Sequence, residues 1–377
     1  MSQTAHLKDI ARIFLKLGII GFGGPAAHIA MMREETVIKR NWLTEQEFLD
    51  LMGATNLIPG PNSTELAIHI GHVKGGWKGL IVAGLCFILP AVFITGIFAF
   101  LYKEYGQLPE VQPFLYGIKP AIIAIILGAV FPLAKKSLKT TTFLIIGLAV
   151  LAGALFGISE IILLFGAGII AVLLYYSKKI RKDQMNSFLP FMLLTTNSTS
   201  KITASNAGLF WIFLKIGSIL YGSGYVLFAF LDTELVSRGL LTRQQLIDSV
   251  AVGQFTPGPV FSSVTFVGYQ IGGISGAAIS TLGIFLPSFV FVALLSVIVT
   301  KLRSSPIFSA FLDAVNVASV AVIVAVCIEM SRDAITDWRT ILIAVMSVAI
   351  VFGFRKLNSA FIVIAGAIAG FLLSLIN

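Results

Sequence analysis

Two Pro-Gly-Pro segments carry the strongest chemical signal in this sequence of 377 residues. Pro59-Gly60-Pro61 is followed by Pro257-Gly258-Pro259 in a matching context about 198 positions later. Neither segment can continue a helix, because proline lacks the backbone donor and glycine is conformationally loose. A helix that restarts after such a break presents unpaired N–H groups and a partial positive charge, and both favour an anion.

Hydroxyl and amide side chains follow both predicted restarts. The first copy carries Asn62, Ser63 and Thr64, and the second carries Ser262 and Ser263. Proline and glycine could also serve only to kink a packed helix. However, backbone leaves a helix inside a membrane only where it is buried in protein or lines a polar cavity. Two matched breaks therefore favour a binding site for an anion.

Two lysines occupy matching places in apolar sequence and could supply charge to this site. Lys16 and Lys215 lie in the related segments Phe-Leu-Lys-Leu-Gly and Phe-Leu-Lys-Ile-Gly. A lysine near the middle of a membrane is costly unless it faces a cavity or a partner. Two such lysines could neutralise a dianion, whereas the alternative is that they snorkel to the membrane surface. Glu35 and Glu234 also recur, and we expect them to form ion pairs at that surface.

A candidate proton relay follows the first break only. Glu65 and His69 are one helical turn apart, whereas the second copy has Ser263 and Val267 at those places. A one-sided relay is one interpretation, and a solvated helix end is the other. The sequence shows no nucleophile with its base, no metal-ligand spacing and no phosphate loop, so we expect no enzyme, no metal and no cofactor.

The composition predicts an all-α polytopic membrane protein. Apolar residues make up 57% of the chain and charged residues 12%, and several apolar runs reach the length of roughly 20 residues that a spanning helix needs. The net charge of +9 comes from short basic clusters between apolar runs, which is the pattern of membrane topology. We therefore expect a lipid bilayer and no nucleic acid as the partner. Both cysteines lie in apolar segments and predict no disulfide.

The sequence repeats itself almost completely. We predict an N-terminal repeat at 1–177, a polar linker at 178–206 and a C-terminal repeat at 207–377. In the first copy, plain spans are expected at about 77–102, 113–134, 141–156 and 158–176. Residues 8–32 either cross once or fold back.

The basic residues predict that the two copies are inverted. They concentrate at 135–139 and 178–182 in the first copy, but at 301–303 and 355–356 in the second, which are the opposite set of loops. By the positive-inside rule the copies then lie upside down relative to each other. We expect about ten membrane spans plus broken or re-entrant helices.

A glycine-rich segment early in each half, together with the Pro-Gly-Pro segments, resembles the long-chain chromate ion transporter (CHR) family. The first is Gly21-Phe22-Gly23-Gly24-Pro25, and its degenerate partner is Tyr221-Gly222-Ser223-Gly224. The resemblance covers essentially the whole chain. It implies export of chromate from the bacterial cytoplasm, driven by the membrane potential or a proton gradient, with sulfate as a structural look-alike. It also adds Gly23, Gly24, Gly222 and Ser223 to the predicted substrate site.

Our hypothesis from the sequence is a carrier for a tetrahedral oxyanion in the bacterial plasma (inner) membrane that works by alternating access. A homodimer is a further possible partner arrangement. The anion, chromate or sulfate, would lie between the two restarted helices, with more of its polar contacts from the first copy. An anion channel or a lipid-phosphate scramblase could use the same broken helices.

Overall fold

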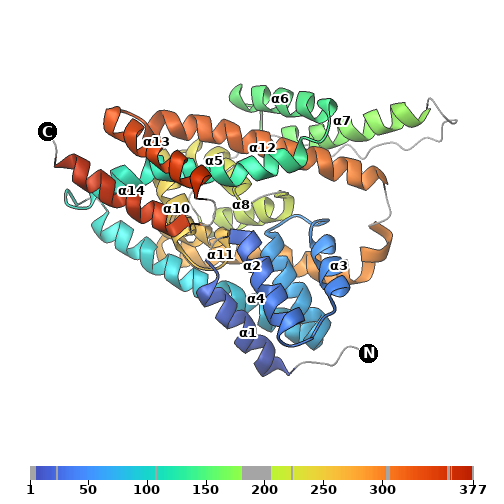
Figure 1. Cartoon of the computed structure of the whole chain (residues 1–377). Helices are drawn as coiled ribbons and strands as arrows, with labels where there is room; N and C mark the ends of the chain where they lie inside the picture. The colour runs from blue at the N-terminus through green and yellow to red at the C-terminus, as the bar shows by residue number, and fades with distance from the viewer. Residues whose placement is uncertain are drawn as a thin grey trace.

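The chain folds into helices, and a computed structural model describes residues 6–22, 24–106, 108–180, 205–221, 224–302, 306–354, 357 and 359–375 (Figure 1). No strand occurs among these residues. The first half contains α1 (Leu7–Ile20), α2 (Gly24–Arg33), a π-helix (Glu34–Ile38), α3 (Glu45–Thr55), α4 (Asn62–Tyr105), α5 (Gln112–Ser137), α6 (Thr141–Leu155) and α7 (Glu160–Ile180). The second half contains α8 (Asn206–Ile219), α9 (Val226–Leu231), a π-helix (Asp232–Val236), α10 (Arg243–Phe255), a 3₁₀ turn (Val260–Ser262), α11 (Ser263–Leu302), α12 (Pro306–Ala334), α13 (Trp338–Gly353) and α14 (Ser359–Ser374).

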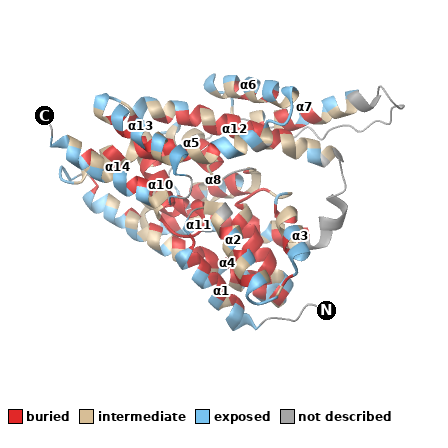
Figure 2. Ribbon diagram, in the orientation of Figure 1, coloured by how far each residue is buried: buried red, intermediate tan, exposed pale blue. Residues whose placement is uncertain are grey.

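Helix length and surface chemistry indicate a membrane protein. Five helices, α4, α5, α7, α11 and α12, are long and apolar enough to cross a bilayer within the described ranges, and α6, α8, α13 and α14 are shorter apolar helices. Large apolar side chains such as Phe93, Ile145 and Phe361 are more than half exposed. In Figure 2 the buried residues gather in the middle of the molecule, while the outward faces remain exposed. Such a surface suits lipid.

The predicted spans are confirmed as helices, and α4 and α11 prove to be helical hairpins. Gly76 (φ 58°) and Gly273 (φ 63°) interrupt these two helices with left-handed backbone, which glycine adopts without strain. On either side of the turn, a Cβ added to Gly71 would collide with the carbonyl of Gly79, so the short arm from Asn62 folds back along the long arm. Gly268 and Gly276 make the same close approach in α11. Each restarted helix is therefore short and returns beside a long helix.

The two repeats are inverted, as their basic loops predict. Leu80, just after the Gly76 turn, packs with Val292, which lies well beyond the turn in α11. At the other end of α4 the ring of Tyr102 contacts Phe266, which lies before that turn, at 5.0 Å between centroids. The long arms of α4 and α11 therefore run antiparallel.

Residues 8–32 do not form one continuous span. Helix α1 has 14 residues and is about 21 Å long, shorter than the roughly 30 Å of a hydrocarbon core. It ends at Ile20 with Gly21 as its C-cap, and α2 begins at Gly24 after a break. Helix α8 has the same length of 14 residues and ends at Ile219, with Leu220 as its C-cap. Both repeats therefore begin with a helix that stops inside the protein.

The helices form two groups. Helices α1 and α4 pack closely, as do α8 and α11, and α4 packs on α11 to join these pairs. The other group exchanges partners between the repeats, because α5 packs on α13 and α14 while α12 packs on α6 and α7. In Figure 1, α5, α6, α7, α12 and α13 lie in the upper part of the view and α1 to α4 in the lower part. We call the first group, together with α3 and α10, which pack on α4 and α11, the inner helices, and the second group the outer helices.

Candidate functional site

Each Pro-Gly-Pro segment is bonded to the broken helix of the other repeat. The N–H of Gly60 donates to the carbonyl of Leu220 at 2.8 Å, and the N–H of Gly258 donates to the carbonyl of Gly21, also at 2.8 Å. Leu220 and Gly21 are the C-cap residues of α8 and α1. Four interrupted helices therefore meet in the middle of the molecule, and each break satisfies a backbone group that another leaves open.

Polar side chains gather at the first restart, where α4 begins. The Asn62 side chain donates to Oδ1 of Asn56 at 2.6 Å. Nδ1 of His28 lies 3.3 Å from the Ser63 hydroxyl, and Nε2 lies 2.8 Å from the Gly21 carbonyl. The buried hydroxyl of Thr64 has no hydrogen-bond partner in the described part of the chain. This end of α4 thus keeps unused polar capacity.

Glu65 lies one turn inside the same restart and is completely buried. Its Oε1 accepts from the Ser288 hydroxyl of α11 at 3.5 Å, and its Oε2 has no partner among the described residues. A Cβ at Gly60 would collide with this carboxyl group, so glycine is needed here both for φ 129° and for space. No hydrogen bond joins Glu65 to His69 in the described ranges, and Nδ1 of His69 is also unpartnered.

The second restart is lined mainly by hydroxyl and apolar groups. Thr95 of α4 lies 3.3 Å from the Ser262 hydroxyl and 3.4 Å from that of Thr256. The Ser263 hydroxyl, at the place that Glu65 has in the first repeat, is buried without a partner in the described part of the chain. Val260 and Phe261 begin the 3₁₀ turn and are buried. The backbone breaks thus match, but their side chains do not.

A polar cavity of about 290 Å³ opens beside the first restart. Asn62 and Asn56 line it from one side, and Tyr221 lines it from the α8–α9 break. Outer helix α12 adds Asn316 and Ser319. The ammonium of Lys139 also lines it and pairs with Asp313 at 2.9 Å. We call this cavity the vestibule.

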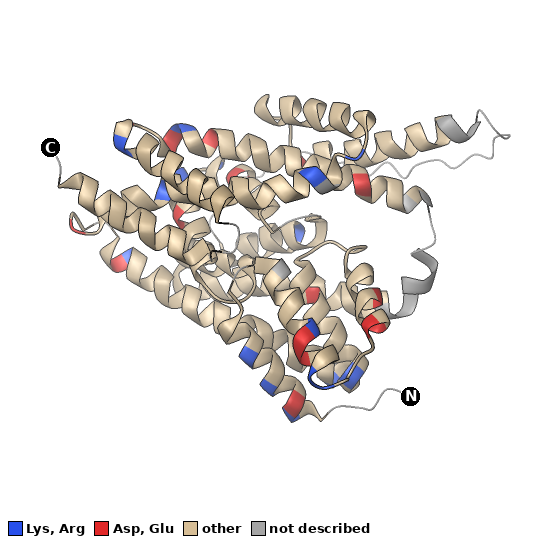
Figure 3. Ribbon diagram, viewed as in Figure 1, with Lys and Arg blue, Asp and Glu red and all other residues tan. Residues whose placement is uncertain are grey.

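The structure places Lys16 and Lys215 on carboxylates. Nζ of Lys16 lies 2.9 Å from Glu35, and Nζ of Lys215 lies 2.6 Å from Glu234. Both lysine side chains remain about half exposed, at 51% and 43%. The charge of each lysine is thus directed to a glutamate 19 residues along the chain, and neither lysine is among the residues that line the vestibule. Figure 3 shows charged residues mostly towards the ends of the helices.

Further basic residues complete the two ion clusters. Arg40 and Lys39 also bond Glu35, and Arg238 bonds Glu234 at 2.6 Å. Burial acts to raise the pKa of Glu35, but hydrogen bonds from Lys16, Arg40 and Lys39 outweigh it and lower the pKa to about 2. The carboxylate therefore stays charged at any physiological pH.

Three predicted site residues lie outside the described part of the chain, and two residues of the observed site were not predicted from the sequence. Gly23, Gly222 and Ser223 lie outside the described residues, while Gly24 has φ 75° and opens α2. Sequence reasoning missed Tyr221 as a cavity residue and Ser288 as the partner of Glu65. Ser288 follows Pro287, which matches Pro90 of the first repeat, so the repeat alignment carried a signal for it.

Comparison with known proteins decides the family. The model of the Chromate transporter family matches residues 8–172 and, a second time, residues 207–371. The chain belongs to the chromate transporter family. A chromate transport protein of Cupriavidus metallidurans is 32% identical over 98% of this chain and 94% of its own length. A probable chromate transport protein of Synechococcus elongatus is 31% identical over 97% of this chain and 95% of its own length.

The two matches to the family confirm a duplicated, multi-pass membrane transporter. No solved structure matches the chain.

Proposed function

We propose that this protein is a secondary active transporter of chromate, and of sulfate as a look-alike, that exports the anion across the bacterial plasma membrane. The observation that carries the proposal is the vestibule, because this polar cavity lies at the N-terminus of the restarted helix α4 at Asn62. A helix N-terminus with free N–H groups is a natural anion site. The inverted repeat with paired broken helices is typical of secondary transporters.

The vestibule offers donors suited to a tetrahedral dianion. Its lining includes Asn56, Asn62, Asn316, Tyr221 and Ser319, whose amide and hydroxyl groups can donate to an anion. Lys139 adds the positive charge at its edge, where Asp313 now holds it. Hydrogen bonds to a charged group are roughly twice as strong as neutral ones, so several neutral donors can replace the water that the anion loses.

Alternating access would arise from motion of the inner helices against the outer helices. Asn56 and Asn62 belong to the inner group, whereas Asn316 and Ser319 belong to outer helix α12. The vestibule therefore opens or closes when the groups shift. The second Pro-Gly-Pro segment, with Ser262 and Ser263, would receive the anion from the opposite side.

Glu65 is our candidate for coupling to protons, with His69 as the next group along α4. A carboxylate at Glu65 would be a buried charge without a positive partner, which is costly. A dianion at the nearby N-terminus of α4 would repel that charge further. Binding of the anion therefore favours the protonated form of Glu65, and by linkage a proton on Glu65 favours the anion. Anion and proton then move in the same direction with one net negative charge, so export is driven by the membrane potential, negative inside, and not by the inward proton gradient.

Reconstitution in liposomes tests the function. Purified protein should support saturable counterflow of labelled chromate, with sulfate competing, and the flux should respond to an imposed proton gradient. Flux that is large, unsaturable and unable to drive counterflow would replace the carrier with a channel. Movement of a fluorescent phospholipid between leaflets, without chromate flux, would favour a scramblase. Absence of any flux from folded protein would overturn the proposal.

A further inference from the structure

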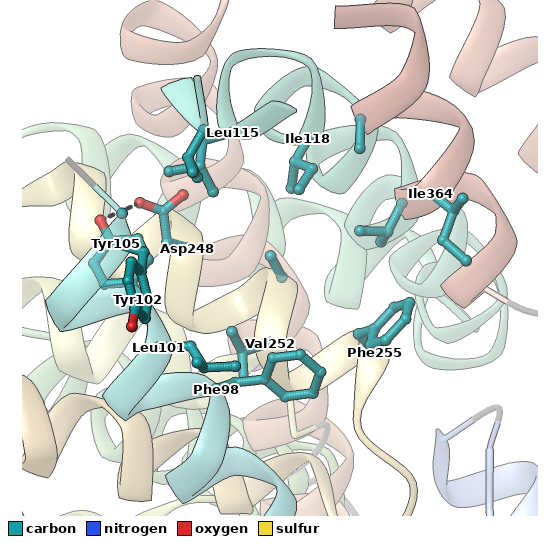
Figure 4. A pocket seen from close by; sticks show the side chains of 15 residues that line it. Phe98, Leu101, Tyr102, Tyr105, Leu115, Ile118, Asp248, Val252, Phe255 and Ile364 are labelled. Carbon is teal, nitrogen blue, oxygen red and sulfur yellow. Dashed lines mark hydrogen bonds between the residues drawn. The ribbon is translucent and has the colours of Figure 1, made fainter. Parts of the chain in front are cut away.

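A second cavity, of about 390 Å³, lies apart from the vestibule. It is enclosed by α4 and α10 of the inner helices and by α5 and α14 of the outer helices. Figure 4 shows aromatic and aliphatic side chains around it, with one carboxyl group at its edge. That carboxyl belongs to Asp248 of α10. We call this cavity the Asp248 pocket.

Asp248 is only 2% exposed, yet half of its carboxyl group is unused. Tyr102 donates to Oδ2 at 2.7 Å, and Gln244 donates to the same oxygen at 2.8 Å. Oδ1 has no hydrogen-bond partner among the described residues. The positive charge of Lys119 on α5 also attracts the carboxyl group electrostatically. A buried acceptor left open in this way is costly unless a ligand uses it.

The walls around this acceptor suit an apolar cation. Phe98, Tyr102, Tyr105 and Phe255 present aromatic rings, and aliphatic side chains such as Val252 fill the remaining wall. Aromatic faces attract a positive charge, most strongly when it is desolvated. An apolar body would replace lipid or water against the walls, while a cationic centre would pair with Oδ1.

The charged residues near this cavity also favour a cation. Tyr105 and Val111 line the cavity next to the loop between α4 and α5, and their sequence neighbours Glu104 and Glu110 are exposed. Lys103, in the same segment, directs its ammonium over the ring of Tyr269 at 5.6 Å. Glu104 and Glu110 together outweigh Lys103, so this segment carries a net negative charge, which favours a cation over an anion.

We propose that the Asp248 pocket binds a hydrophobic organic cation, such as a quaternary ammonium or phosphonium compound, with its charge against Asp248. This ligand has the opposite sign to the anion of the vestibule. It would lie between the inner and the outer helices, so a bound cation would hold the two groups in the arrangement seen here. The proposal does not depend on which anion the protein transports.

Binding of radiolabelled tetraphenylphosphonium to the purified full-length protein in detergent tests the proposal. The wild-type protein should bind saturably, and Asp248→Asn, which keeps the shape of the side chain but removes its charge, should weaken binding at least tenfold. Asp50 holds the matching place in the first repeat, so Asp50→Asn is the control and should bind as the wild type does. Tetraphenylborate has the same shape with a negative charge and should not compete.

A cavity-filling variant protects the test against misfolding. Val252→Phe keeps Asp248 but occupies the pocket, so it should abolish binding while the protein remains monodisperse and melts near the wild-type temperature. Equal binding by wild type, Asp248→Asn and Val252→Phe would show partition into detergent and would overturn the site. Absence of saturable binding by the wild type would also overturn it, whatever the chromate flux.

Discussion

The two Pro-Gly-Pro breaks have the same backbone arrangement but different side chains around them. Each glycine N–H bonds to a helix end in the opposite repeat at 2.8 Å, so the two backbones are closely equivalent. Around the first are Asn62, a buried Glu65 and the vestibule, whereas around the second are Val260 and Ser263. The comparison shows that the architecture needs both breaks, while charged chemistry is concentrated at one.

Substituting the break glycines should have the largest effect, and the two sites should differ in how they can be rescued. Gly60→Ala and Gly258→Ala should each lower the melting temperature and reduce flux more than tenfold, because φ values of 129° and 93° strain alanine by about 1–3 kcal/mol. At Gly60 the added methyl group collides with Glu65, whereas at Gly258 it lies 2.9 Å from Cβ of Ala91. Thermal unfolding followed by fluorescence-detected size-exclusion chromatography measures the melting temperature of each variant, and chromate counterflow in liposomes measures its flux.

The matched rescues sharpen this difference. Adding Glu65→Ser to Gly60→Ala should recover part of the melting temperature but not the proton response. Adding Ala91→Gly to Gly258→Ala should recover part of both stability and flux. Equal failure of the two double variants would mean that backbone strain, and not the side-chain collisions, dominates at both breaks.

Removing the carboxylic acid of Glu65 should remove the functional difference between the two breaks. Glu65→Gln keeps the shape of the side chain but cannot lose a proton, so chromate flux should continue while its stimulation by a proton gradient falls at least tenfold. The matched variant Ser263→Ala should retain the stimulation. Flux is measured in liposomes with and without the gradient, and an unchanged response in Glu65→Gln would remove Glu65 from coupling.

The affinity for chromate should depend on the polar side chains at the first break more than on the apolar ones at the second, and the effect should be moderate. Asn62→Ala removes an amide donor from the vestibule and should raise the apparent KM for chromate about tenfold, as expected for loss of a hydrogen bond to a charged group. The equivalent change in the second repeat, Val260→Ala, should alter KM less than twofold. Similar shifts in both variants would place the anion midway between the breaks.

The smallest effect should come from the ion clusters, in which the repeats are most alike. Glu35→Gln should lower the melting temperature by a few degrees at pH 7. The pKa of Glu35 is about 2 in the folded protein against an ordinary value of 4.5. Its stabilisation is therefore complete above about pH 5 and is lost as the pH falls from 4.5 towards 2. Melting temperatures between pH 4 and pH 8 should show a constant difference from the wild type down to pH 5.

Much of the fold could be predicted because it depends on local and periodic signals. The apolar runs predicted the bounds of α5, α6 and α7 to within a few residues, and the repeat predicted the equivalent helices of the second half. The turn at Gly76 that folds α4 back on itself was marked by two consecutive glycines in both copies, but its sharp reversal depends on the contact between Gly71 and Gly79. That contact is a property of the packed helices and not of the sequence pattern.

The site was less predictable because its contacts join distant segments. The N–H of Gly60 bonds to Leu220, which lies in the other repeat, and no local pattern pairs them. Lys16 is close to Glu35 only because α2 turns after the break at Gly21–Gly24. The sequence therefore identified the breaks and their polar neighbours, whereas the partners of the two lysines required the structure.

The exchange of outer helices between the repeats also constrains how the protein is made. Helix α5 emerges from the ribosome long before α13 and α14, on which it packs. Helix α7 likewise precedes its partner α12. Until α12, α13 and α14 are inserted, the faces of α5 and α7 that pack on them have lipid or chaperones as neighbours. Assembly must then finish from the C-terminus, and a chain cut between the repeats should become stable only when both pieces are present in the same membrane.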